Sequence, residues 1–151
     1  MPQPFAKFLA LDTRSKFTFF KVYAMLGWYR AAILLTSFKR LSAGLDHFKE
    51  EPPRGKISAE TSERARQLAY LVGAAARYTP WQSTCLTQVL TLQRLLAKEH
   101  IGGRFYLGVA RESTSGELNA HAWLRCGEHI INGGRGHEQF SVVSTYSWLE
   151  S

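Results

Sequence analysis

The stretch "TPWQSTCLTQVLTLQRLL", residues 79–96, is where a loop turns into a helix and where the fold is decided. Its first part carries proline, serine and threonine, and its second part repeats leucine and valine at the spacing of a buried helical face. The helix should therefore begin near Ser83 or Thr84 and end before the glycine pair at 102–103. This places Cys85, one of only two cysteines, in the first turn.

A cysteine in the first turn of a helix can act as a nucleophile. The first backbone N–H groups of a helix have no partner within it, and together with the helix dipole they favour the thiolate over the thiol. The same N–H groups can hold the oxyanion of a tetrahedral intermediate. Cys85 is therefore a candidate catalytic residue. The alternative is a small side chain that only packs at the helix start.

Helical segments precede this stretch and strand-like segments follow it. Residues 15–42 predict one or two helices, and Ser58 can cap a further helix that ends at Thr79. Segments rich in aromatic and β-branched residues then predict strands over 104–111, 119–126, 129–132 and 140–148. Helices followed by strands indicate an α+β fold, an antiparallel meander covered by the Cys85 helix.

A histidine in the second predicted strand is the natural partner for the cysteine. In "NAHAW" the alternation of a strand puts His121, Trp123 and Arg125 on one face and the alanines on the other. An imidazole beside a thiol can act as general base and then as general acid. Cys126 falls on the face opposite His121, so we interpret it as structural.

The residue that orients the imidazole is harder to identify, because both aspartates lie in the first 56 residues. If residues 127–128 form a two-residue turn, Asn132 opposes Trp123 and shares the face of His121. Asn132 is therefore the predicted third catalytic residue, with Glu138 or a backbone carbonyl as alternatives.

Two residues just before the predicted nucleophile are candidates to line the cleft. Trp81 and Gln82 immediately precede the predicted helix start, and either could supply an oxyanion donor. The sequence calls for no metal or organic cofactor, because Cys126 and the neighbouring histidines lack a recognised ligand spacing.

The basic charge of the chain is concentrated at one end. Residues 1–56 hold ten Lys/Arg and four acids, whereas residues 57–151 hold nine and eight. We interpret 1–56 as a basic helical arm and 57–151 as the catalytic core of one compact unit. A basic surface implies an acidic partner: a peptide, another protein, a membrane surface or nucleic acid. No nucleic-acid-binding module is recognisable, so nucleic acid is not an expected partner.

The chain is expected to be a cytoplasmic protein without an integral membrane segment. Its longest apolar stretch, "FTFFKVYAMLGWYRAAILLTSF", is interrupted by Lys21 and Arg30, whereas a span needs about 20 mostly uncharged residues. No signal peptide is evident at the N-terminus, and two free cysteines suit a reducing compartment.

Four motifs, taken in their order along the chain, resemble those of a known family. They are Cys85-Leu86, the leucine-rich helix, "GGRFYLGVAR" and "AHAWLRCG". It is similar to the lasso-peptide biosynthesis B protein, in the form of its stand-alone transglutaminase-like leader peptidase. The resemblance implies a transglutaminase-like or papain-like core with Cys85 as nucleophile and His121 as general base and acid. The acidic third residue of the family pattern follows the histidine on the next strand, and here Asn132 or Gly133 occupies that place.

The same resemblance implies a function and a set of partners. The enzyme would remove the leader of a ribosomally made precursor peptide beside a separate leader-recognition protein, and an asparagine-synthetase-like cyclase would then close the macrolactam. Two other functions stay open. The same residues could pass the acyl group to an amine, as a transglutaminase does, or the chain could be a non-catalytic peptide-binding scaffold.

Overall fold

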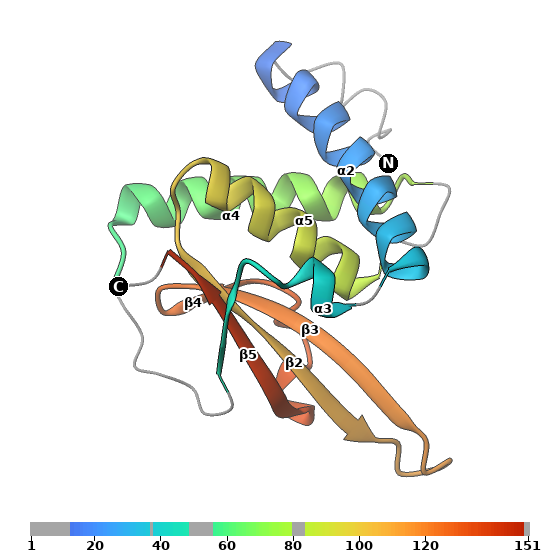
Figure 1. Ribbon diagram of the computed structural model, residues 1–151. Helices are drawn as coiled ribbons and strands as arrows, with labels where there is room; N and C mark the ends of the chain where they lie inside the picture. The colour runs from blue at the N-terminus through green and yellow to red at the C-terminus, as the bar shows by residue number, and fades with distance from the viewer. Residues whose placement is uncertain (1–12, 37, 49–55, 80–83, 150–151) are drawn as a thin grey trace, which may run out of the picture.

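A layer of helices covers one face of an antiparallel sheet in the computed structural model, which describes residues 13–36, 38–48, 56–79 and 84–149 (Figure 1). This confirms the predicted α+β class. The helices are α2 (Thr13–Leu35), α3 (Phe38–Leu41), α4 (Ala59–Ala76) and α5 (Cys85–Lys98). The strands are β1 (Asp46–Phe48), β2 (Gly103–Arg111), β3 (Leu118–Cys126), β4 (His129–Asn132) and β5 (Ser141–Trp148), with a short 3₁₀ turn, η1 (His137–Gln139), before β5.

Side-chain caps fix the starts of the two central helices. The Ser58 hydroxyl accepts a hydrogen bond from the Thr61 amide at 3.1 Å, and the Thr84 hydroxyl accepts one from the Thr87 amide at 3.3 Å. Both caps have extended backbones, as a residue just outside a helix should. The predicted cap at Ser58 is therefore confirmed, and the second helix has its cap at Thr84, one of the two starts that the sequence allowed.

The segment predicted to form one or two helices, residues 15–42, forms one long helix and one short helix. α2 runs without interruption through Gly27 and ends at Leu35, after which α3 adds a single turn. Its apolar residues are spread around the helix rather than gathered on one side, so the sequence alone gives no phase for its buried face. No helix in the described part of the chain is both long and apolar enough to cross a membrane.

The sheet has the order β1-β5-β2-β3-β4, and all its neighbouring strands are antiparallel. Strands β2, β3 and β4 form the predicted meander. The last strand departs from it, because β5 returns to pair with β2 instead of β4. A further strand, β1, pairs with β5 and lies within residues 1–56, which the sequence predicted as a helical arm. The simple meander was therefore wrong for β5 and omitted β1.

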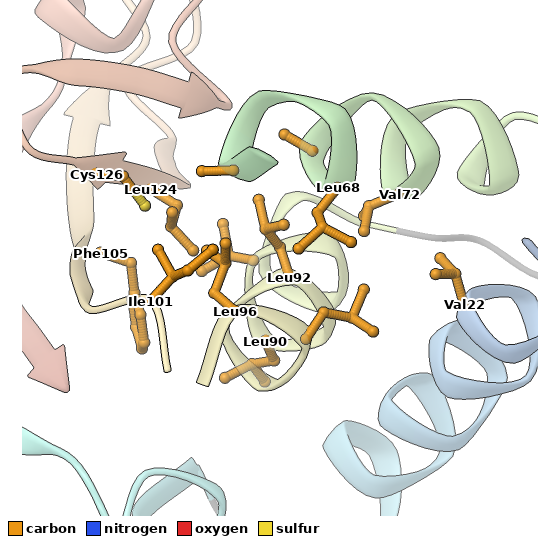
Figure 2. Packing of buried hydrophobic residues seen from close by; sticks show 14 of the residues in the cluster. Val22, Leu68, Val72, Leu90, Leu92, Leu96, Ile101, Phe105, Leu124 and Cys126 are labelled. Atoms are coloured by element: carbon orange, nitrogen blue, oxygen red, sulfur yellow. The ribbon is translucent and has the colours of Figure 1, made fainter. Parts of the chain in front are cut away.

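The core lies between the helices and the sheet (Figure 2). Leu92 and Leu96 of α5 are fully buried against Leu68 of α4 and against Phe105 and Leu124 of the sheet. The arm contributes as well, since α2 packs against both α4 and α5. The buried cluster comprises Val22, Leu26, Ala65, Leu68, Ala69, Val72, Ala75, Val89, Leu90, Leu92, Leu95, Leu96, Ile101, Phe105, Ala122, Leu124, Cys126 and Trp148.

Polar contacts tie the ends of these elements together. The indole N–H of Trp148 donates to the Ile101 carbonyl at 2.8 Å, which holds the end of β5 against the start of β2. Arg64 forms a two-pronged ion pair with Glu99, with nitrogen–oxygen distances of 2.7 and 2.9 Å, between α4 and the end of α5. This pairing raises the pKa of Arg64. α5 is therefore fixed at its start by the Thr84 cap and at its end by the Arg64–Glu99 ion pair.

Candidate active site

Cys85 is the first residue of α5, and its half-buried side chain packs against the core. The cap at Thr84 takes the amide of Thr87, and the Thr84 carbonyl takes the amide of Gln88. Within the described part of the chain, the amides of Cys85 and Leu86 then remain as donors without a partner. The thiol thus lies next to two backbone donors at the positive end of a helix, which suits an anionic sulfur or an oxyanion.

His121 lies in the middle of β3, with its ring on the face of the sheet opposite Ala122 and Leu124. We call this the aromatic face, because Trp123 and Phe140 contact the ring there. The ring stacks on Trp123 at a centroid distance of 5.8 Å and contacts Phe140 at 5.1 Å. The neighbours Ala122 and Leu124 point to the other face and belong to the core. The predicted alternation of this strand is confirmed, and Cys126 is fully buried on the core side.

A backbone carbonyl fixes the tautomer of His121. Nε2 of the ring lies 2.7 Å from the carbonyl oxygen of Gly133. A carbonyl can only accept a hydrogen bond, so Nε2 must carry the proton. In the neutral imidazole the lone pair is then on Nδ1, which is the nitrogen available to take a proton from a thiol. The Gly133 carbonyl therefore holds the imidazole as an Asn side chain does in papain-like cysteine proteases.

Only glycine can occupy position 133. Its φ is +73°, and a Cβ built there would lie 2.5 Å from the Ala122 carbonyl oxygen. The next residue is held in a similar way, because Nδ1 of His137 lies 2.6 Å from the carbonyl of Gly134. His137 also contacts the Trp123 ring at 5.5 Å. Two histidines thus hold two consecutive carbonyls of one glycine turn.

Asn132 points toward α5 instead of toward His121. A bulge in β4 pairs Asn132 with Leu124, so the register predicted from the turn, Asn132 opposite Trp123, was wrong. Its side-chain amide donates to the Gln88 side chain at 3.4 Å. Gln88 lies one turn after Cys85, so Asn132 is linked to the nucleophile helix. Its role as a third catalytic residue stays a prediction.

Cys85 and His121 themselves are not in contact. The Cys85 thiol has no hydrogen-bonding partner among the residues that the structure describes, and His121 is bonded to Gly133. The α5 helix packs on the core face of β3, whereas the His121 ring lies on the aromatic face. The structure therefore does not join the two side chains as a dyad, and the catalytic pair stays a prediction.

The remaining predicted residues lie elsewhere. Trp81 and Gln82 fall outside the described residues. The Glu138 carboxylate is exposed and lies 3.3 Å from Nδ1 of His137, so its contact is with that histidine. Across the described ranges, no three His, Cys, Asp or Glu side chains form a group that could hold a metal ion.

A cleft of about 680 Å³ opens between α4 and β4, beside the glycine turn. His137 forms part of its wall, so the cleft adjoins the face that carries His121. Its other walls are rich in cationic side chains, with one carboxylate, that of Glu128, among the described residues. The lining residues are Arg66, Ala69, Tyr70, Gly73, Arg77, Arg125, Glu128, His129, Ile130, Ile131 and His137.

Sequence reasoning left the group that orients His121 open between Asn132, Glu138 and a backbone carbonyl, and it did not identify His137. Gly133 acts through its backbone carbonyl, which leaves no residue-type signal, and the ring of His137 binds the carbonyl of the next glycine. The available signal was the run "NGGRG" directly after β4, because consecutive glycines after a strand often mark a close backbone approach.

The chain belongs to the transglutaminase-like superfamily, whose family model matches residues 25–145. This superfamily includes cysteine peptidases and acyltransferases, and its domain is typically a cysteine-based enzyme fold. No curated protein and no solved structure matches the chain. The matched range begins inside α2, while the division into an arm, 1–56, and a core, 57–151, stays a prediction.

Proposed function

We propose that this protein is a cysteine endopeptidase that removes the leader from a ribosomally made precursor during lasso-peptide maturation. The observation that carries the proposal is Cys85 at the start of α5 in a chain of the transglutaminase-like superfamily. A strand histidine with its proton fixed on Nε2 supports it. The wider family resemblance of the sequence motifs supplies the substrate class.

In the proposed reaction the Cys85 sulfur attacks the scissile carbonyl carbon. Nδ1 of His121 takes the thiol proton, and the amides of Cys85 and Leu86 hold the oxyanion. His121 then passes the proton to the leaving amine as the C–N bond breaks. Water attacks the resulting thioester, His121 takes a proton from the water, and the thiol is released with the free carboxylate. No cofactor takes part in this reaction.

The reaction requires His121 and Cys85 to meet when substrate is bound. In the free protein α5 packs on the core face of β3 while the His121 ring lies on the other face, so the proposal requires the ring and the thiol to be brought together when substrate binds. The Gly133 carbonyl would keep Nε2 protonated throughout the cycle. Asn132 would act from the other side, through Gln88, to hold the glycine turn against α5.

The expected partners follow from the same proposal. The precursor leader is the substrate, a separate leader-recognition protein would deliver it, and an asparagine-synthetase-like cyclase would act on the released core peptide. The basic arm is the natural surface for these encounters, with Lys16, Lys21, Arg30, Lys39 and Arg40 as the proposed contacts. Neither nucleic acid nor a membrane is required.

The test compares the two cysteines. The neighbouring genes should supply a short precursor and a small recognition protein, and cleavage is followed by mass spectrometry with both present. Cys85→Ala should abolish leader removal, whereas the matched variant Cys126→Ala, in the core, should keep most of it. The intact mass of Cys85→Ala and its melting curve check that the protein is folded.

Three outcomes would contradict the proposal in different ways. Equal losses in the two variants would mean that Cys85 has no special role. A product carrying an added amine in place of a new carboxylate would favour acyl transfer, which uses the same residues with an amine in the place of water. No turnover by the wild-type protein with its partner present would favour a non-catalytic peptide-binding scaffold.

A further inference from the structure

A second groove lies at the opposite end of α5 from Cys85. It has a volume of about 800 Å³ and runs between α2 and the last turns of α5, with α3, β1 and the end of β5 closing its sides. The 14 residues of α5 put roughly 20 Å between its two ends, so the groove is distinct from the candidate active site. Its lining residues are Lys21, Met25, Trp28, Tyr29, Leu41, Gly44, Leu45, Asp46, Gln93, Arg94, Ala97, Lys98, His100, Trp148 and Leu149.

Positive charges from two helices converge in this groove. Lys21 comes from α2, and Arg94 and Lys98 come from α5. The pKa of Lys98 is lowered mainly by the positive charge of Lys21, with smaller contributions from desolvation and from the charge of Arg94. The two ammonium groups are therefore close enough to repel each other, and an anion between them would remove that repulsion.

The acids near these lysines do not provide that anion. Glu99 is adjacent to Lys98, but its carboxylate is held by both prongs of Arg64. Asp46 is the one carboxylate among the described residues that line the groove, and it is exposed. The C-terminal dipole of α5 can account for a lysine at position 98, but it does not explain a lysine from α2 beside it.

An exposed tryptophan stands at the same groove. Trp28 is 63% exposed and rests edge-on against Tyr29, with a centroid distance of 5.0 Å. Tyr29 is more deeply buried, and burial raises its pKa while the charge of Arg94 lowers it. Four more large apolar side chains of α2 are also exposed, namely Phe17, Phe20, Leu34 and Leu35. Exposed apolar surface of this extent marks an interaction site.

We propose that this groove, lined by Lys21, Arg94, Lys98 and Trp28, binds an acidic peptide segment of a partner protein. A carboxylate of the segment would lie between Lys21 and Lys98, and a neighbouring apolar side chain would pack on Trp28. The concave shape fits a single peptide segment, whereas a bilayer needs a flat or convex face. The inference rests on the proposed function only for the identity of the partner, the leader-recognition protein, and a binding assay tests it without any activity.

The probe is a fluorescein-labelled synthetic peptide that alternates glutamate with leucine and phenylalanine. Fluorescence anisotropy measures its binding to the full chain, with a lysine-for-glutamate version of the peptide as the first control. Lys21→Glu combined with Lys98→Glu should weaken binding of the acidic peptide by a factor of about 10 or more, because two attractions become repulsions. The matched variant, Lys56→Glu with Arg111→Glu, makes the same change of net charge away from the groove and should alter the affinity less than about twofold.

Trp28→Ala supplies an independent variant that leaves the charge unchanged. It should weaken the acidic peptide several-fold at both low and high salt, whereas the effect of the lysine reversals should shrink as salt rises. Far-UV circular dichroism checks that each variant is folded. Equal loss in the Lys21/Lys98 and Lys56/Arg111 variants would overturn the proposal, since binding would then follow net charge alone.

Three further results would also overturn it. Tighter binding of the basic peptide would exclude an acidic partner. A single-stranded oligonucleotide or phosphatidylserine vesicles that bind more tightly than the peptide, with the same dependence on Lys21 and Lys98, would assign the groove to nucleic acid or to a membrane. A concentration-dependent dimer in light scattering that Trp28→Ala abolishes would assign it to a second copy of the chain.

Discussion

Of the long helices that the structure describes, α5 and α2 are the most apolar, and they are used in opposite ways. Seven residues of α5 are buried, and its apolar stripe fills the centre of the core. α2 is longer, at 23 residues, yet it buries Val22, Leu26 and Ala32 while large apolar side chains such as Phe17 and Leu35 face outward. Apolar content is therefore a poor guide to burial. The phase of the apolar residues decides which helix is core and which keeps a surface for a partner.

This contrast separates the chemistry from the recognition. The nucleophile candidate begins a helix that is held at both ends, by the Thr84 cap at its start and by the Arg64–Glu99 ion pair at its end. The proposed docking surface combines the outward face of α2 with Arg94 and Lys98 at the far end of α5. A catalytic group needs a fixed position, whereas a binding surface needs exposed area, so the division suits a peptidase that is served by a partner.

The largest effect should be a loss of stability when a buried leucine of α5 is truncated, in contrast to an exposed leucine of α2. Leu92→Ala removes a side chain with no exposure in the middle of α5, so the free energy of unfolding should fall by about 3 kcal/mol from lost burial and an unfilled cavity. Leu34→Ala in α2, at 65% exposure, should leave stability within about 0.5 kcal/mol. Urea unfolding of both variants measures the difference. Similar losses would mean that the outward face of α2 is covered in solution.

The next largest effect concerns the sheet beneath α5. His121→Ala should reduce leader cleavage by a factor of at least about 10² because the general base and acid is lost, while the melting temperature stays near that of the wild type. Asn132→Ala should cost less, since its amide contacts Gln88 rather than the reacting groups. Cleavage rates at saturating precursor, with melting curves, separate the two. A His121→Ala protein with native activity would exclude the proposed dyad, and a larger loss in Asn132→Ala would return the third role to its side chain.

Much of the fold could be predicted because local rules determined it. Ser58 and Thr84 cap their helices by hydrogen bonds to amides three residues ahead, and that spacing is visible in the sequence. The strands from 103 to 148 were recognisable from β-branched and aromatic residues between glycines. The face of His121 followed from the period of two, and Trp123 confirms it.

The features that could not be predicted depend on contacts between distant segments. β1 is a three-residue strand whose pairing with β5 makes it extended, and its own composition gives no strand signal. The bulge at Leu124 shifts Asn132 toward α5, and no residue type announces it. The orienting carbonyl of Gly133 was open as a general alternative, but its position depends on the same bulge and on the turn that follows.

The smallest effect should come from the charges of the arm, and it should appear in the encounter rather than in the chemistry. Arg30→Glu combined with Arg40→Glu reverses one half-buried and one exposed charge of the arm and leaves the candidate catalytic residues unchanged. Single surface charges contribute little and are screened over about 8 Å at physiological salt. The apparent KM for precursor with its recognition partner should therefore rise a few-fold at low salt, while kcat at saturation stays unchanged.

The measurement for this last prediction is the cleavage rate against partner concentration at low and high salt. High salt should bring the wild-type and reversed curves together, because it screens the attraction that the reversal removes. The control is Glu60→Lys with Glu63→Lys, at the exposed start of α4. It changes the net charge without removing a cation, so it should not raise the apparent KM at either salt concentration. Identical curves for the wild type and the arm variant at both salts would place recognition outside Arg30 and Arg40. A fall in kcat instead would mean that the arm helix, despite its exposed face, helps to set the geometry at Cys85.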